Sequence, residues 1–365
     1  MSAPPPGGAP TAWVGSPDDA GSGAPTLRRV RLGPGGPELL GPAQDVGPDP
    51  TYLARDEGGS LPDVVVAVHE RAEGALSAWV EAPGRLEPLG RPQRVPAGPC
   101  HVVVDAEAGL VHVAAYAAGA ISTSPLGPEG LGPVASQVRW TPPGPSRGDR
   151  RAASHAHQVV LDRRRHRLLV PDLGADLLRV LRVTGRDRVL EDLGAVEVHR
   201  GAGPRHLVVD GDWAYCLNEL DATLSAVDLL GGREVHRVAT TAAGGVPAHP
   251  SAVRLLAPGH LVLATRGPDT ASLVRVAGPD MEVLDEVGCG GEHPRDLVAT
   301  ADGATVLVAG RASGTVSALR VDLAAGTLTP LPDVAGVPSP ACLLPCGDAA
   351  AGADGPAPPQ EGGSS

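Results

Sequence analysis

Two polar groups at the ends of one apolar stretch have the side chains for acid–base chemistry. The stretch "GPRHLVVDGDWAYCLNEL" begins at Gly203 and carries Arg205 and His206 near its start. Asn218 and Glu219 stand near its end. An imidazole and a carboxylate can exchange protons, and a guanidinium can stabilise developing negative charge. The apolar middle, broken by a turn, predicts two antiparallel strands that bring both polar groups together.

The same rhythm of short strands and turns returns along the chain. Its period of roughly 45–55 residues is typical of propeller blades. Six copies begin at Tyr52, His101, His157, His206, Ser251 and Asp296. The N-terminal "TAWVGS" and "PTLRRVRL" resemble a copy without its first strand, and the C-terminal "PSPACLLP" resembles a first strand alone. An irregular all-β array with another number of blades is the alternative.

We therefore predict an all-β fold, a seven-bladed β-propeller closed by pairing of the N- and C-terminal strands, because closure removes exposed sheet edges. The propeller is expected to form one domain over residues 11–346. Residues 1–10 are predicted to be flexible. Residues 347–365, rich in Gly, Ala and Pro, are predicted to be a disordered tail.

Propeller geometry places the candidate chemistry on one rim of the central channel. The first strand of a blade lines the channel and the second returns beside it, so the start of one adjoins the end of the other. The site residues predicted at these positions are His101, His155, His157, Arg205, His206, Asn218, Glu219, Arg266 and Arg295. Further polar residues at such positions are His69, Glu70, Tyr116, Asp172, His249, His293, Asp296 and Arg311.

Each of these residues alone could be a turn former or a loop hydrogen-bonding group. The prediction of a site rests on their convergence from several blades on one concavity. His112, His166 and His260 fall in strands or in turns at the other end, and are expected to be structural or solvated.

Composition restricts the possible functions. The formal net charge is −12, which argues against general nucleic-acid binding. The chain has no lysine, so Schiff-base chemistry and a P-loop are excluded. Its five cysteines form no CxxC pair, and only His155 and His157, two residues apart, leave a metal site conceivable. We expect no cofactor and no metal.

The N-terminal segment lacks a charged region followed by an apolar one, and no apolar run is long enough for a membrane span. A cytoplasmic protein without membrane contact is therefore expected. Its predicted partner is an anionic small molecule held by arginines against the overall negative charge. The oligomeric state is left open.

The chain resembles the seven-bladed β-propeller lactonases of the bacterial 6-phosphogluconolactonase type. The resemblance rests on "GPCHVVVD", "SHAHQVVLD", "GAGPRHLVVD" with "YCLNELDATL", "HPRDLVATADG" and "VPSPACLLP". It implies hydrolysis of a sugar lactone, such as 6-phosphogluconolactone to 6-phosphogluconate. It also implies that His157, Arg205 and Glu219 are catalytic and that Arg266 and Arg295 assist in binding. Ala115-Tyr116 and His69-Glu70 stand where the family has Asn-Tyr and Asn-Glu, which bears on the substrate.

For such a hydrolysis we expect His157 or Glu219 as the base that activates water, and Arg205 as the group that stabilises the oxyanion. Arg266 and Arg295 would hold a phosphate or carboxylate. Two alternatives stay open: a cycloisomerase that acts on a muconate-like acid with the same groups, and a non-enzymatic propeller that binds a partner on its rim.

Overall fold

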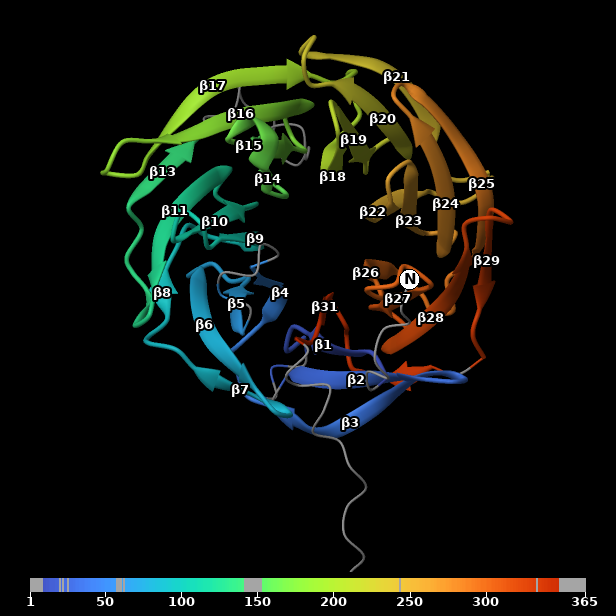
Figure 1. Cartoon of the computed structure of the whole chain (residues 1–365), viewed down its shortest axis with the longest axis horizontal. Coiled ribbons are helices and arrows are strands. Elements are labelled where there is room, and N and C mark those ends of the chain that lie inside the picture. The colour runs from blue at the N-terminus through green and yellow to red at the C-terminus, as the bar shows by residue number, and fades with distance from the viewer. Residues whose placement is uncertain are drawn as a thin grey trace, which may run out of the picture.

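The computed structural model describes residues 9–19, 21, 23–24, 26–56, 61, 63–140, 153–242, 244–332 and 334–347. They form seven antiparallel sheets arranged in a ring, which confirms the predicted seven-bladed propeller (Figure 1). Most of the predicted flexible N-terminus and all but Gly347 of the predicted tail lie outside the described residues. No helix in the described ranges is long and apolar enough to cross a bilayer.

We number the blades 1 to 7 in chain order, so that the six sequence copies are blades 2 to 7. One strand of each blade lies innermost, and neighbouring innermost strands contact each other around the whole ring (Figure 1). From blade 1 to blade 7 the innermost strands are β31 (Cys342–Pro345), β4 (Pro50–Arg55), β9 (Pro99–Asp105), β14 (Val160–Asp162), β18 (Pro204–Asp210), β22 (His249–Ala257) and β26 (Pro294–Ala299).

The remaining strands follow outward in the same order. The second strands are β1 (Thr11–Gly15), β5 (Val64–His69), β10 (Leu110–Ala115), β15 (Arg167–Asp172), β19 (Trp213–Asn218), β23 (His260–Arg266) and β27 (Thr305–Gly310). The third strands are β2 (Leu27–Gly33), β6 (Ala75–Ala82), β11 (Ala120–Gly127), β16 (Leu177–Thr184), β20 (Thr223–Asp228), β24 (Thr270–Ala277) and β28 (Thr315–Asp322).

The outer edges differ from blade to blade. Four blades end in one long strand, and the other three end in two short ones. The long strands are β3 (Gly36–Gln44), β17 (Val189–Glu197), β21 (Arg233–Ala239) and β25 (Asp280–Gly288). The short pairs are β7 (Arg85–Pro88) with β8 (Gln93–Arg94), β12 (Gly130–Leu131) with β13 (Ser136–Arg139), and β29 (Thr327–Pro330) with β30 (Ala335–Gly336). One short 3-10 helix, Arg163–Arg165, joins β14 to β15.

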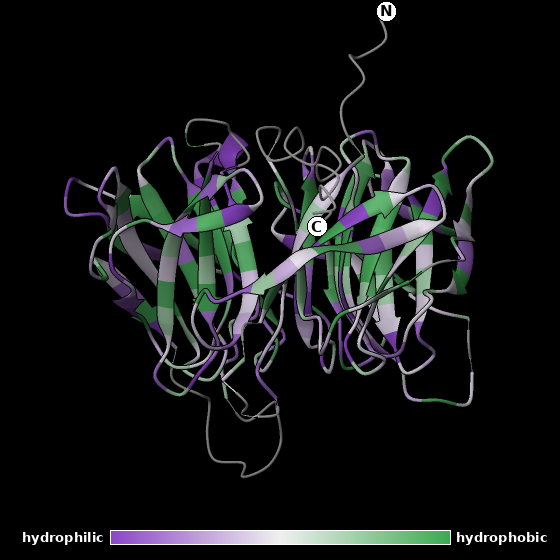
Figure 2. Ribbon diagram, turned by 90° about the horizontal axis from the view of Figure 1, so that it is seen from below, coloured by the Kyte–Doolittle hydropathy of each residue, from purple (hydrophilic) through white to green (hydrophobic). Residues whose placement is uncertain are grey.

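Small aliphatic side chains hold the blades together. Seven clusters of buried residues lie between successive blades, one for each neighbouring pair, and consist largely of Val, Leu and Ala. Because the second strand of a blade is covered on both faces, it reads as a continuous apolar run, as in "VVVAVH" of β5, which is buried throughout. Hydrophobic residues accordingly fill the strands between the two loop-bearing faces (Figure 2).

The ring closes in blade 1, where the two ends of the chain share one sheet. β31 pairs antiparallel with β1, so that Leu343 lies opposite Val14, as the sequence predicted. Glu81 of β6 reinforces this junction from blade 2. Its carboxylate accepts hydrogen bonds from Trp13 Nε1 at 2.5 Å, from Arg55 Nη2 at 2.7 Å and from the Gly347 amide at 2.8 Å.

Replacing Glu81 with alanine is expected to lower the free energy of unfolding by about 3 kcal/mol, because it leaves a buried guanidinium and a buried indole N–H without their acceptor. The Glu81 side chain is 1% exposed, and that of Arg55 is 14% exposed. Urea unfolding would measure the change. Glu87→Ala is the matched control: its ion pair with Arg85 is more than half exposed, so a loss below about 1 kcal/mol is expected. Equal losses in both variants would contradict this role of Glu81.

Candidate active site

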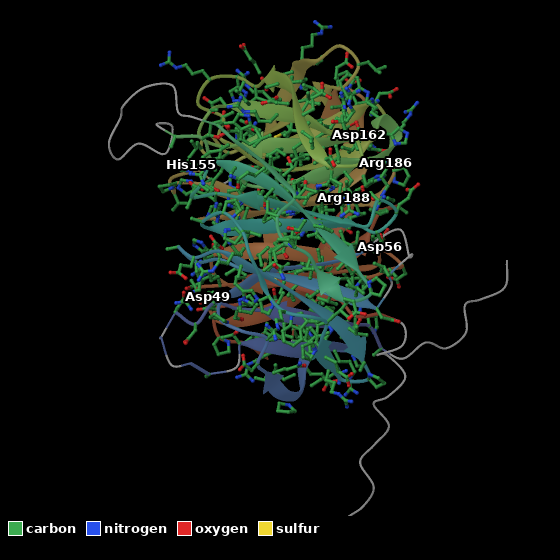
Figure 3. All side chains as sticks on the ribbon, turned by 90° about the vertical axis from the view of Figure 1, so that its left-hand side faces the viewer. Asp49, Asp56, His155, Asp162, Arg186 and Arg188 are labelled. Carbon is green, nitrogen blue, oxygen red and sulfur yellow. The ribbon has the colours of Figure 1, made fainter. Side chains whose placement is uncertain are left out.

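The predicted neighbours on the rim are paired in the sheets. Pro204 at the start of β18 lies opposite Asn218 at the end of β19, and His249 lies opposite Arg266 in the next blade. Figure 3 shows the two faces edge-on, with His155 on one and Arg188 on the other. We call the face with His155 the site face and the other the far face.

A bulge at one position sets the side chains of the innermost strands. In β18 the register passes from Pro204 opposite Asn218 to His206 opposite Leu217, which leaves Arg205 as the extra residue. The same shift occurs in blades 2, 3, 6 and 7, directly after the first proline of the strand. A bulge re-aims side chains. Because of it, Arg205 reaches His157 in the neighbouring blade instead of following the regular alternation.

Glu219 anchors two arginines from two blades. Its Oε2 lies 3.0 Å from Arg205 Nη1 and 2.9 Å from Arg266 Nη2. Backbone carbonyls hold the same arginines: Arg205 Nε donates to Ser251 O at 2.7 Å, and Arg266 Nε donates to His249 O at 2.9 Å. The side chains of Arg205 and Glu219 are each 2% exposed. Both guanidiniums are therefore fixed in orientation.

The hydrogen bond between Arg205 and His157 determines the state of the imidazole. Arg205 Nη1 donates to His157 Nε2. Since a guanidinium only donates, Nε2 is the unprotonated nitrogen and the ring proton is on Nδ1. Nδ1 has no hydrogen-bond partner among the described residues. His157 thus presents a neutral ring whose basic nitrogen faces Arg205.

A chain of rings extends from His157 across the channel. His157 lies 5.6 Å from His206, and His206 lies 5.8 Å from His101, measured between ring centroids. On its other side His157 meets Tyr116 edge-on at 5.3 Å, and Tyr116 stacks on His155 at 4.2 Å. The structure therefore brings together all four histidines that the sequence placed in the site.

Burial keeps three of these imidazoles neutral. It lowers the pKa values of His101, His157 and His206 well below the usual value, and the Arg205 guanidinium lowers them further. Glu219 acts in the opposite direction on His157. Burial and the nearby Arg295 also lower the pKa of Arg205, against the effect of Glu219. The site thus combines neutral imidazoles with guanidiniums.

Arg295 gives the site an uncompensated positive charge. It is partly buried, and it lies close enough to Arg205 and His157 to lower the pKa values of both. It makes no ion pair or side-chain hydrogen bond with the described residues. Arg205 and Arg266 share the carboxylate of Glu219, whereas Arg295 lies near them without a carboxylate partner among the described residues. An anionic group can therefore be accommodated here.

Asn218 is placed differently from the other predicted residues. Its Nδ2 donates to Thr223 Oγ1 at 2.9 Å and to Ser225 Oγ at 2.7 Å, and the residue is 0% exposed. These bonds lie within its own blade and connect β19 to β20. The geometry favours a structural role for Asn218, and its part in substrate binding stays a prediction.

Other rim residues are also engaged in holding the fold. Asp172 accepts hydrogen bonds from Ser154 Oγ at 2.6 Å and from the His155 amide at 2.8 Å. His69 contacts the Pro48 carbonyl at 2.6 Å and Ser77 Oγ at 2.8 Å. These contacts fix the loops around the site.

The sequence interpretation missed two residues of the channel wall. The Tyr52 ring lies 4.1 Å from that of His101, and Arg254 Nη2 contacts both the Tyr52 hydroxyl at 3.4 Å and Asp296 Oδ1 at 2.7 Å. Alignment of "PTYL" with "PCHV" and "PRHL" would have found Tyr52, because it places this residue with His101 and His206.

Neither a cysteine nucleophile nor a metal centre is supported by the residues described around the site. Cys100 lies at the start of β9, where its thiol donates to His157 O at 3.3 Å, and burial raises its pKa to about 12. It therefore does not supply a thiolate nucleophile at neutral pH. Within the described part of the chain, no group of three or more His, Cys, Asp or Glu side chains is arranged to hold a metal ion.

Comparison with known proteins assigns the family. The family model described as "Lactonase, 7-bladed beta-propeller" matches residues 11–345. The chain belongs to this lactonase family. The chain is 26% identical over 309 residues to the 6-phosphogluconolactonase of Bacillus subtilis (strain 168), covering 81% of this chain and 86% of that protein. It is 28% identical over 275 residues to that of Serratia proteamaculans (strain 568), covering 71% and 78%.

Solved structures share the fold of this chain. A putative 6-phosphogluconolactonase from Bacteroides fragilis superposes with a TM-score of 0.83 at 24% identity, covering 94% of this chain and 100% of the other. A periplasmic gluconolactonase from Pseudomonas aeruginosa superposes with a TM-score of 0.82 at 23% identity, covering 92% and 98%. The resemblance inferred from the strand motifs is thereby confirmed.

Proposed function

We propose that this protein hydrolyses a sugar lactone, and that the lactone is 6-phosphogluconolactone. The observation that carries the proposal is the cluster of Arg205, Glu219 and His157, which places a neutral imidazole nitrogen against a fixed guanidinium. The names of the relatives point to the same reaction.

The proposed reaction begins when the lactone carbonyl oxygen accepts a hydrogen bond from Arg205. The hydrogen bond from Arg205 to His157 Nε2 then weakens, which frees this nitrogen to accept a proton from water. The water oxygen attacks the carbonyl carbon. Arg205 stabilises the resulting oxyanion. The bond from carbon to the ring oxygen breaks, and the ring oxygen takes the proton from His157. The products are a free hydroxyl and a carboxylic acid, which loses its proton to water.

Glu219 serves in this scheme as a positioning residue for Arg205. One of its oxygens is shared by two guanidiniums, so it is committed to holding them. The sequence left His157 and Glu219 as candidates for the base that activates water. We therefore assign this role to His157.

Arg295 is proposed to bind the phosphate of the substrate. Arg266 is held by Glu219 and two backbone carbonyls, whereas Arg295 has no such partner among the described residues. Replacing Arg295 with glutamine is expected to raise KM for 6-phosphogluconolactone about tenfold or more, with a smaller change in kcat, because a charge-assisted contact is lost. Rates are to be measured above spontaneous hydrolysis.

Two comparisons make this experiment decisive. With unphosphorylated gluconolactone, Arg295→Gln should leave KM nearly unchanged. Arg233→Gln, an exposed arginine on the outer strand β21, should behave as wild type with both substrates. Wild-type protein that is folded yet gives no rate above the spontaneous one would refute the proposed function.

A further inference from the structure

A cavity lies on the far face, away from the proposed active site. It has a volume of about 530 Å³ and lies between blades 3 and 4. Its walls come from the β9–β10 turn, the β14–β15 turn and the β16–β17 turn, which contribute Glu107, His166 and Arg186 among others. Figure 3 shows Arg186 and Arg188 on the face opposite His155. None of the residues assigned to lactone hydrolysis lines this cavity.

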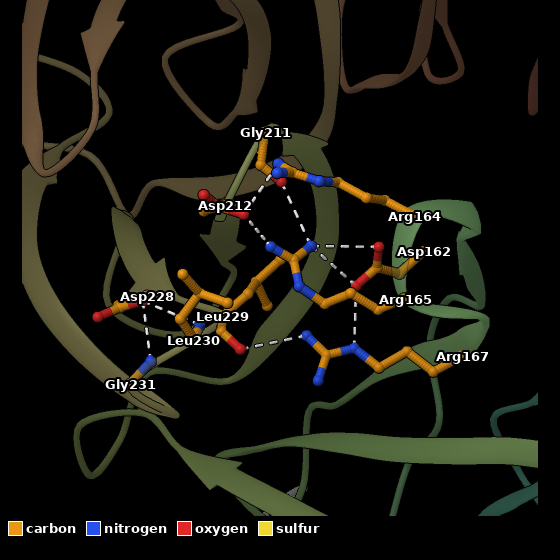
Figure 4. Close-up of polar contacts among 10 residues, drawn as sticks. All are labelled: Asp162, Arg164, Arg165, Arg167, Gly211, Asp212, Asp228, Leu229, Leu230 and Gly231. Atoms are coloured by element: carbon orange, nitrogen blue, oxygen red, sulfur yellow. Dashed lines mark hydrogen bonds and ion pairs between the residues drawn. The ribbon is translucent and has the colours of Figure 1, made fainter.

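Most arginines in the nearby "DRRRHR" segment are used in structural contacts. Arg164 Nη1 lies 2.9 Å from Asp212 Oδ1, and Arg165 pairs with the same carboxylate (Figure 4). Arg167 Nε lies 2.9 Å from Asp162 Oδ2. The contacts with Asp212 tie the β14–β15 turn to blade 5, and the contact with Asp162 joins β14 to β15 within blade 4. They explain these arginines without a ligand.

The arginines of the β16–β17 turn have no such explanation. Arg186 and Arg188 line the cavity, and neither makes an ion pair or side-chain hydrogen bond with the described residues. Arg188 has a φ of 57°, a left-handed conformation that glycine or asparagine adopts more easily. Arg163, also in the wall, is compensated by Asp105 at 3.5 Å. Two guanidiniums that have no partner among the described residues therefore line the cavity.

One residue of the cavity wall, His112, has a buried ring nitrogen without a partner among the described residues. His112 is 0% exposed, and its Nδ1 contacts Thr123 Oγ1 at 2.8 Å. Its Nε2 has no partner among the described residues. A buried polar atom without a partner is uncommon and needs explanation. Leu161 and Leu168 form the apolar wall beside it.

We propose that the far-face cavity binds a small organic anion. Its phosphate or carboxylate group is held by Arg186 and Arg188, and its apolar body packs against the leucines. His112 lies in the wall beside the bound molecule, so binding changes the surroundings of its ring. This site is separate from the proposed lactonase site, and its occupancy does not depend on that reaction.

The test is a titration of the full-length protein with phenyl phosphate and, in parallel, with benzoate. Binding is monitored through the imidazole ¹⁵N resonances in NMR spectra. His112 is assigned through the variant His112→Asn. A saturable shift of the His112 resonance is expected with at least one probe. The probe that binds more tightly identifies the anionic group, and inorganic phosphate alone should bind more weakly than phenyl phosphate because it lacks an apolar body.

Arg186→Gln combined with Arg188→Gln is expected to raise the Kd about tenfold or more, because two charge-assisted contacts are lost. The matched control is Arg164→Gln combined with Arg182→Gln, which removes two exposed arginines that do not line the cavity. It should leave the Kd unchanged. The proposal is overturned if neither probe shifts His112, or if the shift persists with the same Kd in the Arg186 and Arg188 variant.

Discussion

Replacing Arg205 with glutamine is expected to reduce kcat for lactone hydrolysis about 10²–10³-fold, because the fixed donor for the oxyanion is removed. The same change removes the group that holds His157 Nε2 in place. KM is expected to change less, since the contact is stronger in the transition state than in the bound lactone. Initial rates over a range of lactone concentrations, corrected for spontaneous hydrolysis, would separate the two constants.

The fold should survive this substitution, because Glu219 keeps its ion pair with Arg266 at 2.9 Å. Arg205→Lys retains a charge without the planar fork of donors, so partial recovery of kcat is expected. Arg164→Gln, on the far face, provides a control with unchanged kinetics. A folded Arg205→Gln protein with wild-type kcat would exclude Arg205 from the chemistry.

Acidification from pH 7 to pH 4 is expected to destabilise the propeller, with His112 alone contributing about 3 kcal/mol. Burial lowers the pKa of His112 to about 4, and it lowers those of His101, His157 and His206 as well. The unfolded chain takes up protons on its histidines near pH 6.5, so it binds more protons than the folded chain below that pH. Stability is therefore lost as pH falls from about 6.5 towards the folded pKa values.

Urea unfolding at several pH values would measure this loss, and His112→Asn should show a shallower decline than wild type. His199 provides a comparison of opposite sign. Although burial lowers its pKa, hydrogen bonds to Asp221 and Glu234 raise it overall. Its stabilisation is present below pH 6.5 and is lost as pH rises through the folded pKa, so His199→Asn should cost more stability at pH 6 than at pH 8. Identical pH profiles for wild type and His112→Asn would contradict the account.

The fold was predictable because its signals are local and repeated. Each inner strand is short and apolar, and "PSPACLLP" could only complete the partial N-terminal copy if the ring closed, as β31 does with β1. Antiparallel pairing then placed Arg205 near Glu219, since the start of one strand adjoins the end of the next.

The orientation of individual side chains could not be predicted in the same way. Asn218 and Glu219 are adjacent in the sequence, yet Asn218 bonds to Ser225 inside its blade while Glu219 holds two arginines. The bulge at Arg205 decides which neighbour it reaches, and alternation alone does not reveal a bulge. Pairing between blades, as between Arg165 and Asp212, joins residues that are distant in sequence and carry no shared motif.

The most direct test of the central claim is a crystal structure of the protein with 6-phosphogluconate, the product of the proposed reaction. The account predicts that the product lies on the site face, with its carboxylate hydrogen-bonded to Arg205 beside His157 and its phosphate on Arg295. A product molecule bound only elsewhere, for example at Arg186 and Arg188 on the far face, would contradict the account.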